Sequence, residues 1–315
     1  MALAINEANT TQSNYFDSGL TQQVYEKSPV YARLKQKNNV RASGGNQIQF
    51  AIRYQTLGQA EAVSPRQQIT YEQKETRTAG TLDWKYVVGK NMISWDERVQ
   101  NTGKPQIIDL LRDKTEELQQ DMLNKFNTML YSTSAAADEF SALDEIVDST
   151  TTYAGIAQAD AAEWAANEDT SETRLHLWGS ATSISKMMND STFGPSYPDL
   201  LVTTRDLWSK FESLADPQRV YRDNSMADLG FDAVKFGRSV VVADYACTAN
   251  RLYGLDTSNL SFRYHPDFNF KTDKWDDLKQ AGFPQAMVKL VYWAGNLQCK
   301  MRKTNFKYTA LDYTV

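Results

Sequence analysis

Residues 105–131 read PQIIDLLRDKTEELQQDMLNKFNTMLY, and this stretch decides how the rest of the chain is interpreted. Proline is favoured in the first turn of a helix, and an acidic residue there, here Asp109, complements the helix dipole. Apolar residues follow at helical spacing: Ile107, Leu111, Leu118, Met122, Phe126 and Met129. A helix of this length spans about 40 Å. Its other face is charged, so the pattern predicts a long amphipathic helix that packs against a sheet or a neighbouring chain.

Two segments with strand periodicity precede this helix. Residues 47–55, QIQFAIRYQ, alternate apolar and polar positions, and in residues 81–88, TLDWKYVV, every second residue from Leu82 to Val88 is apolar and is expected on one face. Residues 56–80 between them carry few apolar anchors, and a connection of this length is unusual inside a compact domain. A two-stranded ribbon is marginal alone in water. The sequence therefore predicts a projecting ribbon that needs another surface to lie on.

The chain after the long helix predicts a mixed sheet with helices packed on it. Residues 138–199 hold twelve acidic and two basic residues, a net charge of −10. Short apolar runs at 200–202, 239–243, 251–255 and 260–264 predict strands. The negative charge is therefore concentrated in the middle of the chain.

The C-terminal region predicts a basic β-hairpin. Residues 287–293 are an apolar run, Gly295-Asn296 is a turn dipeptide, and residues 297–302 alternate apolar and polar positions. Five lysines and arginines lie between 289 and 307, with no acidic residue before Asp312. A basic tail and a basic N-terminal segment thus flank an acidic middle, which suits head-to-tail contacts between copies.

Composition excludes several classes of protein. The 315 residues predict about two domains. With 41% hydrophobic and 23% charged residues, the composition is that of an ordinary globular protein. No apolar stretch is long enough for a membrane helix, and no signal peptide is expected. Cys247 and Cys299 are expected to be reduced, which indicates folding in a cytoplasm. A net charge of −5 does not suggest tight binding to nucleic acid.

The sequence argues against an enzyme mainly by what it lacks. It contains no GxxxxGK[ST], GxGxxG, GxSxG, HExxH or CxxC motif. His176 and His265 are the only histidines, so a three-histidine zinc site is impossible. His176 is expected at a half-exposed strand position and His265 in a loop. No catalytic residue, cofactor or metal ligand is therefore assigned.

The segment from Lys27 to Arg41 carries five basic residues and no acidic one. One interpretation is a solvated helix face before the turn at residues 43–45. The other is an arm that lies against something acidic, either a neighbouring subunit or packaged nucleic acid. The sequence leaves both open.

The order of these parts resembles the major capsid protein of tailed bacteriophages, the Hong Kong-97-type fold. Within it, FSALDEIVDSTTTYAGI (140–156) resembles the start of the family's A-domain, and LLVTTRDLWSKFESL (200–214) its strand-then-helix element. Residues 230–244, 250–256 and 294–297 also fit the family's pattern. Each motif is loose alone, and their order and spacing over residues 30–311 carry the likeness.

The resemblance implies an α+β fold with four parts. Residues 1–45 would form the N-arm, 46–92 the E-loop β-ribbon, 93–139 with 261–315 the P-domain, and 140–260 the A-domain. The P-domain would combine the long spine helix with the terminal strands. Contacts between subunits would involve Arg33, Lys35, Lys37 and Arg41 of the N-arm and Arg66, Tyr71, Lys74 and Arg77 of the E-loop.

The implied function is structural. Copies would assemble as hexamers and pentamers into an icosahedral shell around double-stranded DNA, formed in the bacterial host cytoplasm and ending in the virion. Because only about 40 residues precede the ribbon, a separate scaffolding protein is expected, together with a portal. Contact with DNA would be weak and non-specific, and no membrane is involved. Some family members join an E-loop lysine to a neighbour's asparagine, but no partner for Lys74 can be matched here.

Two alternatives remain at this stage. The first is an encapsulin, a compartment with the same fold that holds enzyme cargo instead of DNA. The second is a carbohydrate-active enzyme or binding module, because glycoside hydrolysis needs only two carboxylates. Asp273, Asp276 and Asp277 around Trp275 are the most suggestive cluster, but lysines interleave with them, as in a solvated, salt-bridged loop.

Overall fold

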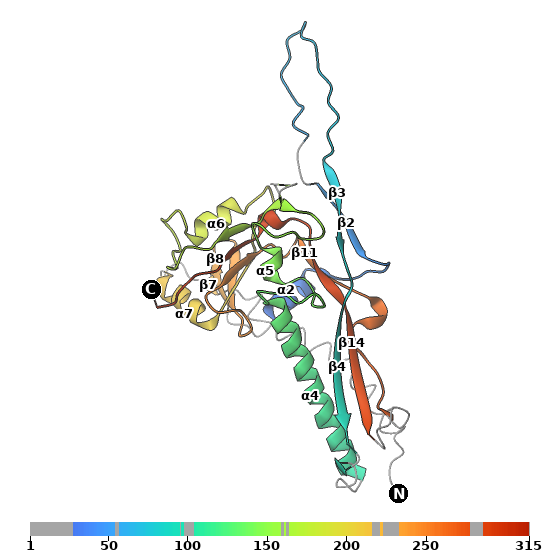
Figure 1. Ribbon diagram of the computed structural model, residues 1–315. Helices are drawn as coiled ribbons and strands as arrows, with labels where there is room; N and C mark the ends of the chain where they lie inside the picture. Colours follow the sequence, from blue (N-terminus) through green and yellow to red (C-terminus); the bar gives the residue numbers. More distant parts are fainter. Residues whose placement is uncertain are drawn as a thin grey trace.

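A computed structural model describes residues 28–53, 57–94, 96–97, 104–158, 161, 164–215, 221–222, 233–277 and 286–314. The first 27 residues of the expected N-arm and residues 230–232 of the quoted motif lie outside this set. Within it the chain is α+β, as expected, with an elongated body from which one loop projects (Figure 1). The helices are α2 (Pro29–Gln36), α4 (Lys104–Leu130), α5 (Leu143–Ile146), α6 (Ile184–Asp190), α7 (Arg205–Leu214) and the 3-10 turns Pro266–Phe268 and Arg302–Thr304.

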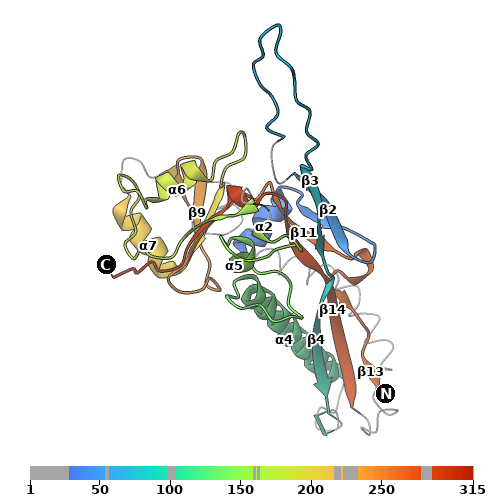
Figure 2. The same cartoon turned by 45° about the horizontal axis from the view of Figure 1, so that its top comes forward.

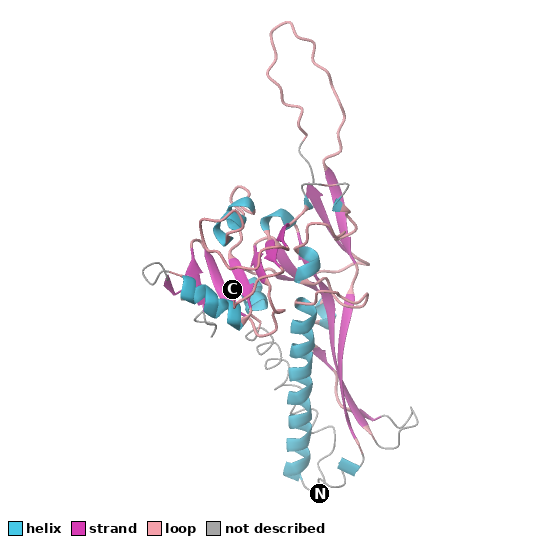
Figure 3. Ribbon diagram, turned by 60° about the vertical axis from the view of Figure 1, so that its left-hand side comes forward, coloured by secondary structure: helices cyan, strands magenta, loops and turns pink. Residues whose placement is uncertain are grey.

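Strand β14 (Met287–Cys299) organises a six-stranded sheet. It pairs antiparallel with four strands, and a sixth strand pairs with β11 in parallel. The partners of β14 are β4 (Lys85–Ile93), β11 (Leu260–Tyr264), β12 (Lys271–Thr272) and β13 (Asp276–Asp277), and the sixth strand is β1 (Val40–Ala42). Helix α4 runs along this sheet (Figure 3).

The expected long helix is confirmed, since α4 spans 27 residues. Its apolar stripe is buried, including Leu118, Met122 and Phe126. The helix approaches β4 closely at Gly89, where an added Cβ atom would lie 2.7 Å from Met122 Cγ. A glycine is therefore needed at the point where helix and strand meet.

The hairpin expected at Gly295-Asn296 is wrong, because both residues lie inside β14. Gly295 pairs with Tyr264 on β11 and with Lys85 on β4. A Cβ atom on Gly295 would lie 2.4 Å from the Arg263 carbonyl oxygen, so the glycine allows close strand approach instead of a turn. The Asn296 side chain accepts from Ser141 N at 3.0 Å and donates to Asp83 O at 2.9 Å.

The face expected for residues 81–88 is also wrong. Strand β3 (Arg77–Leu82) ends before Asp83, and β4 begins a new strand in another sheet at Lys85. Leu82 is buried, but Tyr86 and Val88 are 67% and 52% exposed, and Val87 faces the core instead. The alternation in the sequence continues through a point where the chain changes partner.

The projecting ribbon pairs β2 (Ile48–Arg53) with β3 in antiparallel register, from Ile48 opposite Leu82 to Arg53 opposite Arg77. The second strand thus begins earlier than expected, at Arg77. Its inner end is anchored because Ile48, Phe50 and Ile52 are buried. Residues 57–76 continue beyond the strands as a long open loop (Figure 1).

The second sheet lies to one side of α4, with α6 and α7 beside it (Figure 2). Its order is β5-β15-β10-β6-β9-β8-β7. The strands are β5 (Asn167–Asp169), β6 (Leu200–Thr203), β7 (Tyr221–Arg222), β8 (Ala233–Phe236), β9 (Ser239–Ala243), β10 (Leu252–Leu255) and β15 (Phe306–Tyr308). Residues 306–308 fall in the range predicted for the P-domain, yet they pair within this sheet. The domain boundaries remain a prediction.

None of the helices in the described ranges is both long enough and apolar enough to cross a membrane.

The packing of β10 against β15 gives a test of the second sheet. An added Cβ atom on Gly254 would lie 2.1–2.6 Å from three ring carbons of the fully buried Phe306. We expect Gly254→Ala to lower the free energy of unfolding by about 1–3 kcal/mol, because the buried ring has no free space to move into. Urea denaturation measures this. Gly44→Ala is the matched control, since nothing lies within 4 Å of its added Cβ atom, and an equal loss in both variants would contradict the expectation.

Candidate assembly surfaces

The projecting loop exposes every side chain from Leu57 to Glu75. Tyr71 is 87% exposed, and Ile69 and Val63 are 47% and 45% exposed. Within the loop, Gln67 N donates to Ser64 O in a turn, and the Gln59 side chain donates to the Glu72 carbonyl. A loop of this length with so little internal support requires another surface to become ordered.

All four residues predicted as E-loop contacts are exposed on this ribbon. Arg66, Tyr71 and Lys74 lie on the loop, and Arg77 begins β3. The structure therefore leaves them accessible to a partner, and their role as contacts stays a prediction.

Two of the predicted N-arm residues bind within their own chain. Arg33 Nε and Lys37 Nζ on and just after α2 lie 3.3 Å and 3.0 Å from Asp199 Oδ2. Asp199 is 4% exposed, and its other oxygen accepts hydrogen bonds from Thr257 N and Oγ1. These contacts fasten α2 to the residue that precedes β6. Sequence analysis did not find Asp199, because it lies 166 residues from Arg33.

The remaining two, Lys35 and Arg41, are exposed. Arg41 lies on β1, at the edge of the six-stranded sheet. The four N-arm residues thus divide into an internal anchor and an accessible pair.

A buried charge cluster joins four distant segments. Lys307 Nζ on β15 is surrounded by carboxylate oxygens of Asp148 at 3.1 Å, Glu168 at 3.2 Å and Asp144 at 3.3 Å. Arg251 forms a second ion pair with Asp144. Lys307 is 1% exposed, so the cluster holds α5 with the residues after it, β5 and the residue before β10 around β15.

The electrostatics at Asp148 show how the cluster is balanced. Burial would raise the pKa of this carboxyl. Hydrogen bonds from the Thr150 and Thr151 backbone N–H groups and from Lys307 outweigh burial and hold the pKa well below its ordinary value. Asp148 therefore stays ionised beside Lys307 across the physiological range.

An apolar patch covers the face of β4 that points away from α4. Tyr86, Val88 and Met92 are 67%, 52% and 52% exposed. Opposite them on β14, Tyr292 pairs with Val88 and Val288 with Met92, and both are half-buried. Exposed apolar side chains gathered on one sheet face are typical of an interaction surface. Sequence analysis missed this patch because it placed Tyr86 and Val88 on one face with Leu82, which is buried.

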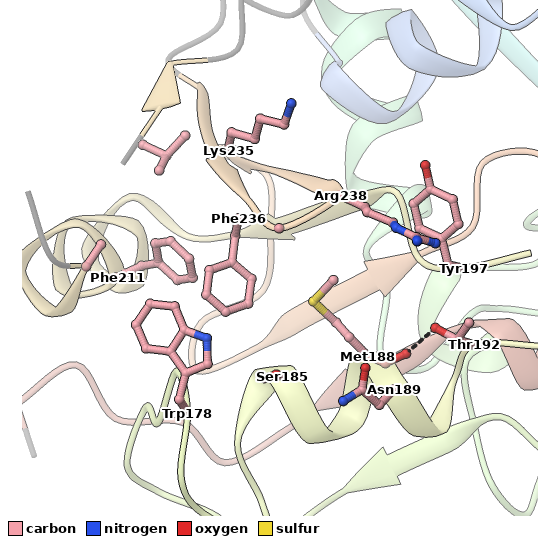
Figure 4. A pocket seen from close by; sticks show the side chains of 13 residues that line it. Trp178, Ser185, Met188, Asn189, Thr192, Tyr197, Phe211, Lys235, Phe236 and Arg238 are labelled. Atoms are coloured by element: carbon pink, nitrogen blue, oxygen red, sulfur yellow. Dashed lines mark hydrogen bonds between the residues drawn. The ribbon is translucent and has the colours of Figure 1, made fainter. Parts of the chain in front are cut away.

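A cavity of about 530 Å³ lies between α6, α7 and the β8–β9 hairpin. In it the Trp178 and Phe236 rings are 5.1 Å apart, and Phe211 meets Phe236 edge-on at 5.4 Å (Figure 4). Arg238 lies over the Tyr197 ring at 5.7 Å on another side of the cavity. Aromatic walls with a basic rim would suit an apolar group, and the described lining holds no histidine, cysteine or carboxylate.

His265 and the cluster around Trp275 make local structural contacts. His265 Nδ1 accepts from Asp267 N at 3.3 Å and so caps a 3-10 turn. Trp275 is 4% exposed with Lys289 over its ring, so it offers no platform for a sugar. Within the described ranges no group of three or more His, Cys, Asp or Glu side chains could hold a metal ion.

No model of a known protein family matches this sequence, and no curated protein matches it either. Solved structures do. The capsid asymmetric unit of cyanophage A-1(L) aligns with a TM-score of 0.66 and 16% identity, covering 87% of this chain and 90% of that chain. The capsid of Myoviridae phage XM1 aligns with a TM-score of 0.56 and 11% identity, covering 88% of this chain and 91% of that chain. A structure of Mycobacterium phage Bobi aligns with a TM-score of 0.55 and 10% identity, covering 89% of this chain and 90% of that chain. The chain therefore has the phage capsid fold of Hong Kong-97 type, as the sequence predicted.

The Lys307 cluster gives a stability test. Lys307→Met would leave three carboxylates facing one another with less compensation. We expect a loss of about 3–5 kcal/mol in the free energy of unfolding near neutral pH, measured by chemical denaturation. Lys300→Met, at an exposed lysine, is the control and should change little.

The wild type and Lys307→Met should also differ in how their free energy of unfolding depends on pH. In the wild type the lowered pKa of Asp148 stabilises the fold above about pH 4, the range in which an unfolded Asp is ionised, and this contribution is lost on acidification. In Lys307→Met the clustered carboxyls take up protons more readily when folded. Its stability should therefore rise as the pH falls from about 7 to about 5. Parallel pH profiles for the two proteins would contradict this account of the cluster.

Proposed function

We propose that this chain is the major capsid protein of a tailed bacteriophage. Copies assemble as hexamers and pentamers into an icosahedral shell that encloses double-stranded DNA. The observation that carries the proposal is the capsid fold over 87% of the chain, aligned with a TM-score of 0.66. The projecting loop supports this proposal, because its residues do not pack against the body of the chain and are explained by contact with a second subunit.

The loop and the apolar patch are complementary parts of this assembly. The E-loop presents Ile69 and Tyr71 to solvent, while the patch on β4 presents Tyr86 and Val88. The loop projects away from the body (Figure 1), and the described residues of the same chain leave both surfaces exposed. We infer that the E-loop of one copy lies on a neighbouring copy and that contacts of this kind are repeated around the shell.

The role is structural and not enzymatic. Assembly takes place in the host cytoplasm with a separate scaffolding protein and a portal, and the product is the virion shell. Contact with DNA is weak and non-specific. Two basic residues of the N-terminal segment, Arg33 and Lys37, are paired with Asp199, which reduces the positive charge available for DNA.

The first experiment is expression of the chain alone, followed by sedimentation and negative-stain electron microscopy. We expect closed or irregular shells in the pelleted fraction. In the second arm, the chain is co-expressed with the scaffolding protein, because assembly can require that protein. Nuclease-protected DNA after packaging would support the phage assignment, and a docked enzyme cargo would favour an encapsulin. A chain that stays monomeric in both arms would contradict the proposal.

The E-loop can be tested separately. In Ile69→Ser/Tyr71→Ser, two exposed apolar contacts are lost, so the thermal midpoint of the free subunit should not change. The chain concentration needed for assembly should rise at least about tenfold, equivalent to about 1.4 kcal/mol per contact site. Tyr313→Ser, at an exposed tyrosine outside the loop, is the control. Unchanged assembly in the double variant would show that the loop is not a contact.

A further inference from the structure

Two arginines lie opposite each other on neighbouring strands. Strand β1 pairs with β11 in parallel, and Arg41 is in register with Arg263. Registered residues of adjacent strands point to the same face, about 5 Å apart. Arg41 is exposed and Arg263 is half-buried. Like charges in this arrangement repel, so the pair destabilises the isolated subunit.

Neutral groups hold both guanidinium groups in place. Arg41 Nε donates to Asn38 O at 3.0 Å and its Nη2 to Asn39 Oδ1 at 3.3 Å. Arg263 Nε donates to Gln298 Oε1 at 2.7 Å. Within the described residues, no carboxylate forms an ion pair with either arginine, and the two Nη groups of Arg263 make no hydrogen bond. Burial, and then the charge of Arg41, lower the pKa of Arg263.

The amide that holds Arg263 is itself incompletely bonded. Gln298 is 1% exposed, and its Oε1 also accepts from Ser261 Oγ at 3.3 Å. Its Nε2 is buried and has no hydrogen-bond partner in the part of the chain that the structure describes. Buried donors are nearly always paired in folded proteins. Two guanidinium groups on adjacent strands, one of them bonded to this buried amide, therefore have no carboxylate partner among the described residues.

Elsewhere in the described residues, two buried charged groups are matched by opposite charges. Lys307 is surrounded by three carboxylates, and Arg33 and Lys37 share Asp199. The pair of Arg53 and Arg77 on the ribbon is also in register, but both are exposed, so water screens their repulsion. The Arg41–Arg263 pair differs because one member is half-buried and bonded to a buried amide.

We propose that Arg41 and Arg263, the latter positioned by Gln298, form a receptor for a single carboxylate side chain of a second copy of this chain. The inference rests on the proposed function, since it assigns one contact of the assembly. A fixed guanidinium fork matches the two oxygens of a carboxylate. Nucleic acid would require a wider basic surface, and two other basic residues of the N-terminal segment, Arg33 and Lys37, are already paired with Asp199. The chain's net charge of −5 supplies carboxylates in excess.

The test compares free and assembled subunits. Arg41→Gln and Arg263→Gln remove the repulsion, so the thermal midpoint of the free subunit should stay equal or rise. The same variants lose the receptor, so the concentration for half-assembly should rise about tenfold. Arg53→Gln, from the exposed pair, should change neither quantity. A lower midpoint with normal assembly would overturn the proposal and leave a structural role.

A second measurement separates this inference from the proposed function. Thermal unfolding of the unassembled wild type is followed in sodium acetate and in sodium chloride of equal ionic strength. Acetate should raise the midpoint of the wild type and of Arg53→Gln, but not that of Arg263→Gln. Equal effects of the two salts would overturn the receptor even if shells form. A short DNA duplex that stabilises the wild type more than acetate does, and loses this effect in Arg263→Gln, would overturn it in favour of nucleic acid.

Discussion

Strand β14 is hydrogen-bonded along its length to four other strands, and the rest of the molecule is placed relative to it. On one edge it carries β4 through nine registered pairs, which sets β4 where α4 can pack against it. Further along the chain it carries β11, and through β11 the edge strand β1. The ribbon leaves the body just before β4, so its direction is also fixed by this pairing. Gly295 is essential here because it allows β11 and β4 to flank the strand at the same position.

Charged side chains have two different roles around these sheets. Asp199 and Lys307 are nearly fully buried, and each is matched by opposite charges from distant segments, so they fix the position of α2 and of β15. Such matched pairs gain little from a partner outside the chain, because their hydrogen-bonding capacity is already used. The Arg41–Arg263 pair has no carboxylate partner in the part of the chain that the structure describes. A basic side chain that contacts a carboxylate of its own chain thus serves as an internal anchor, and one that lacks such a contact can bind a carboxylate of another chain.

The sequence predicted what depends on local periodicity. The spine helix was found because its apolar stripe repeats through 27 residues, and the ribbon because Gln47–Gln55 alternates over a full strand. It failed where tertiary pairing overrides a local pattern. Gly295-Asn296 is a turn dipeptide, but β11 and the partners of Asn296 hold it extended. The alternation around Trp84 hides the change from β3 to β4. The partner of Arg33 lies 166 residues away, and no local pattern points to it.

The position of β14 in the chain has a consequence for the kinetics of folding. The six-stranded sheet joins residues 40–42 and 85–93 to strands that begin at residue 260 or later. During synthesis, β4 therefore emerges from the ribosome long before the strand that completes its pairing. Folding that depends on such distant contacts is slow, and apolar side chains such as Val87 and Ile93 stay exposed in the meantime. A chain interrupted before residue 287 lacks β14 and therefore cannot complete the six-stranded sheet.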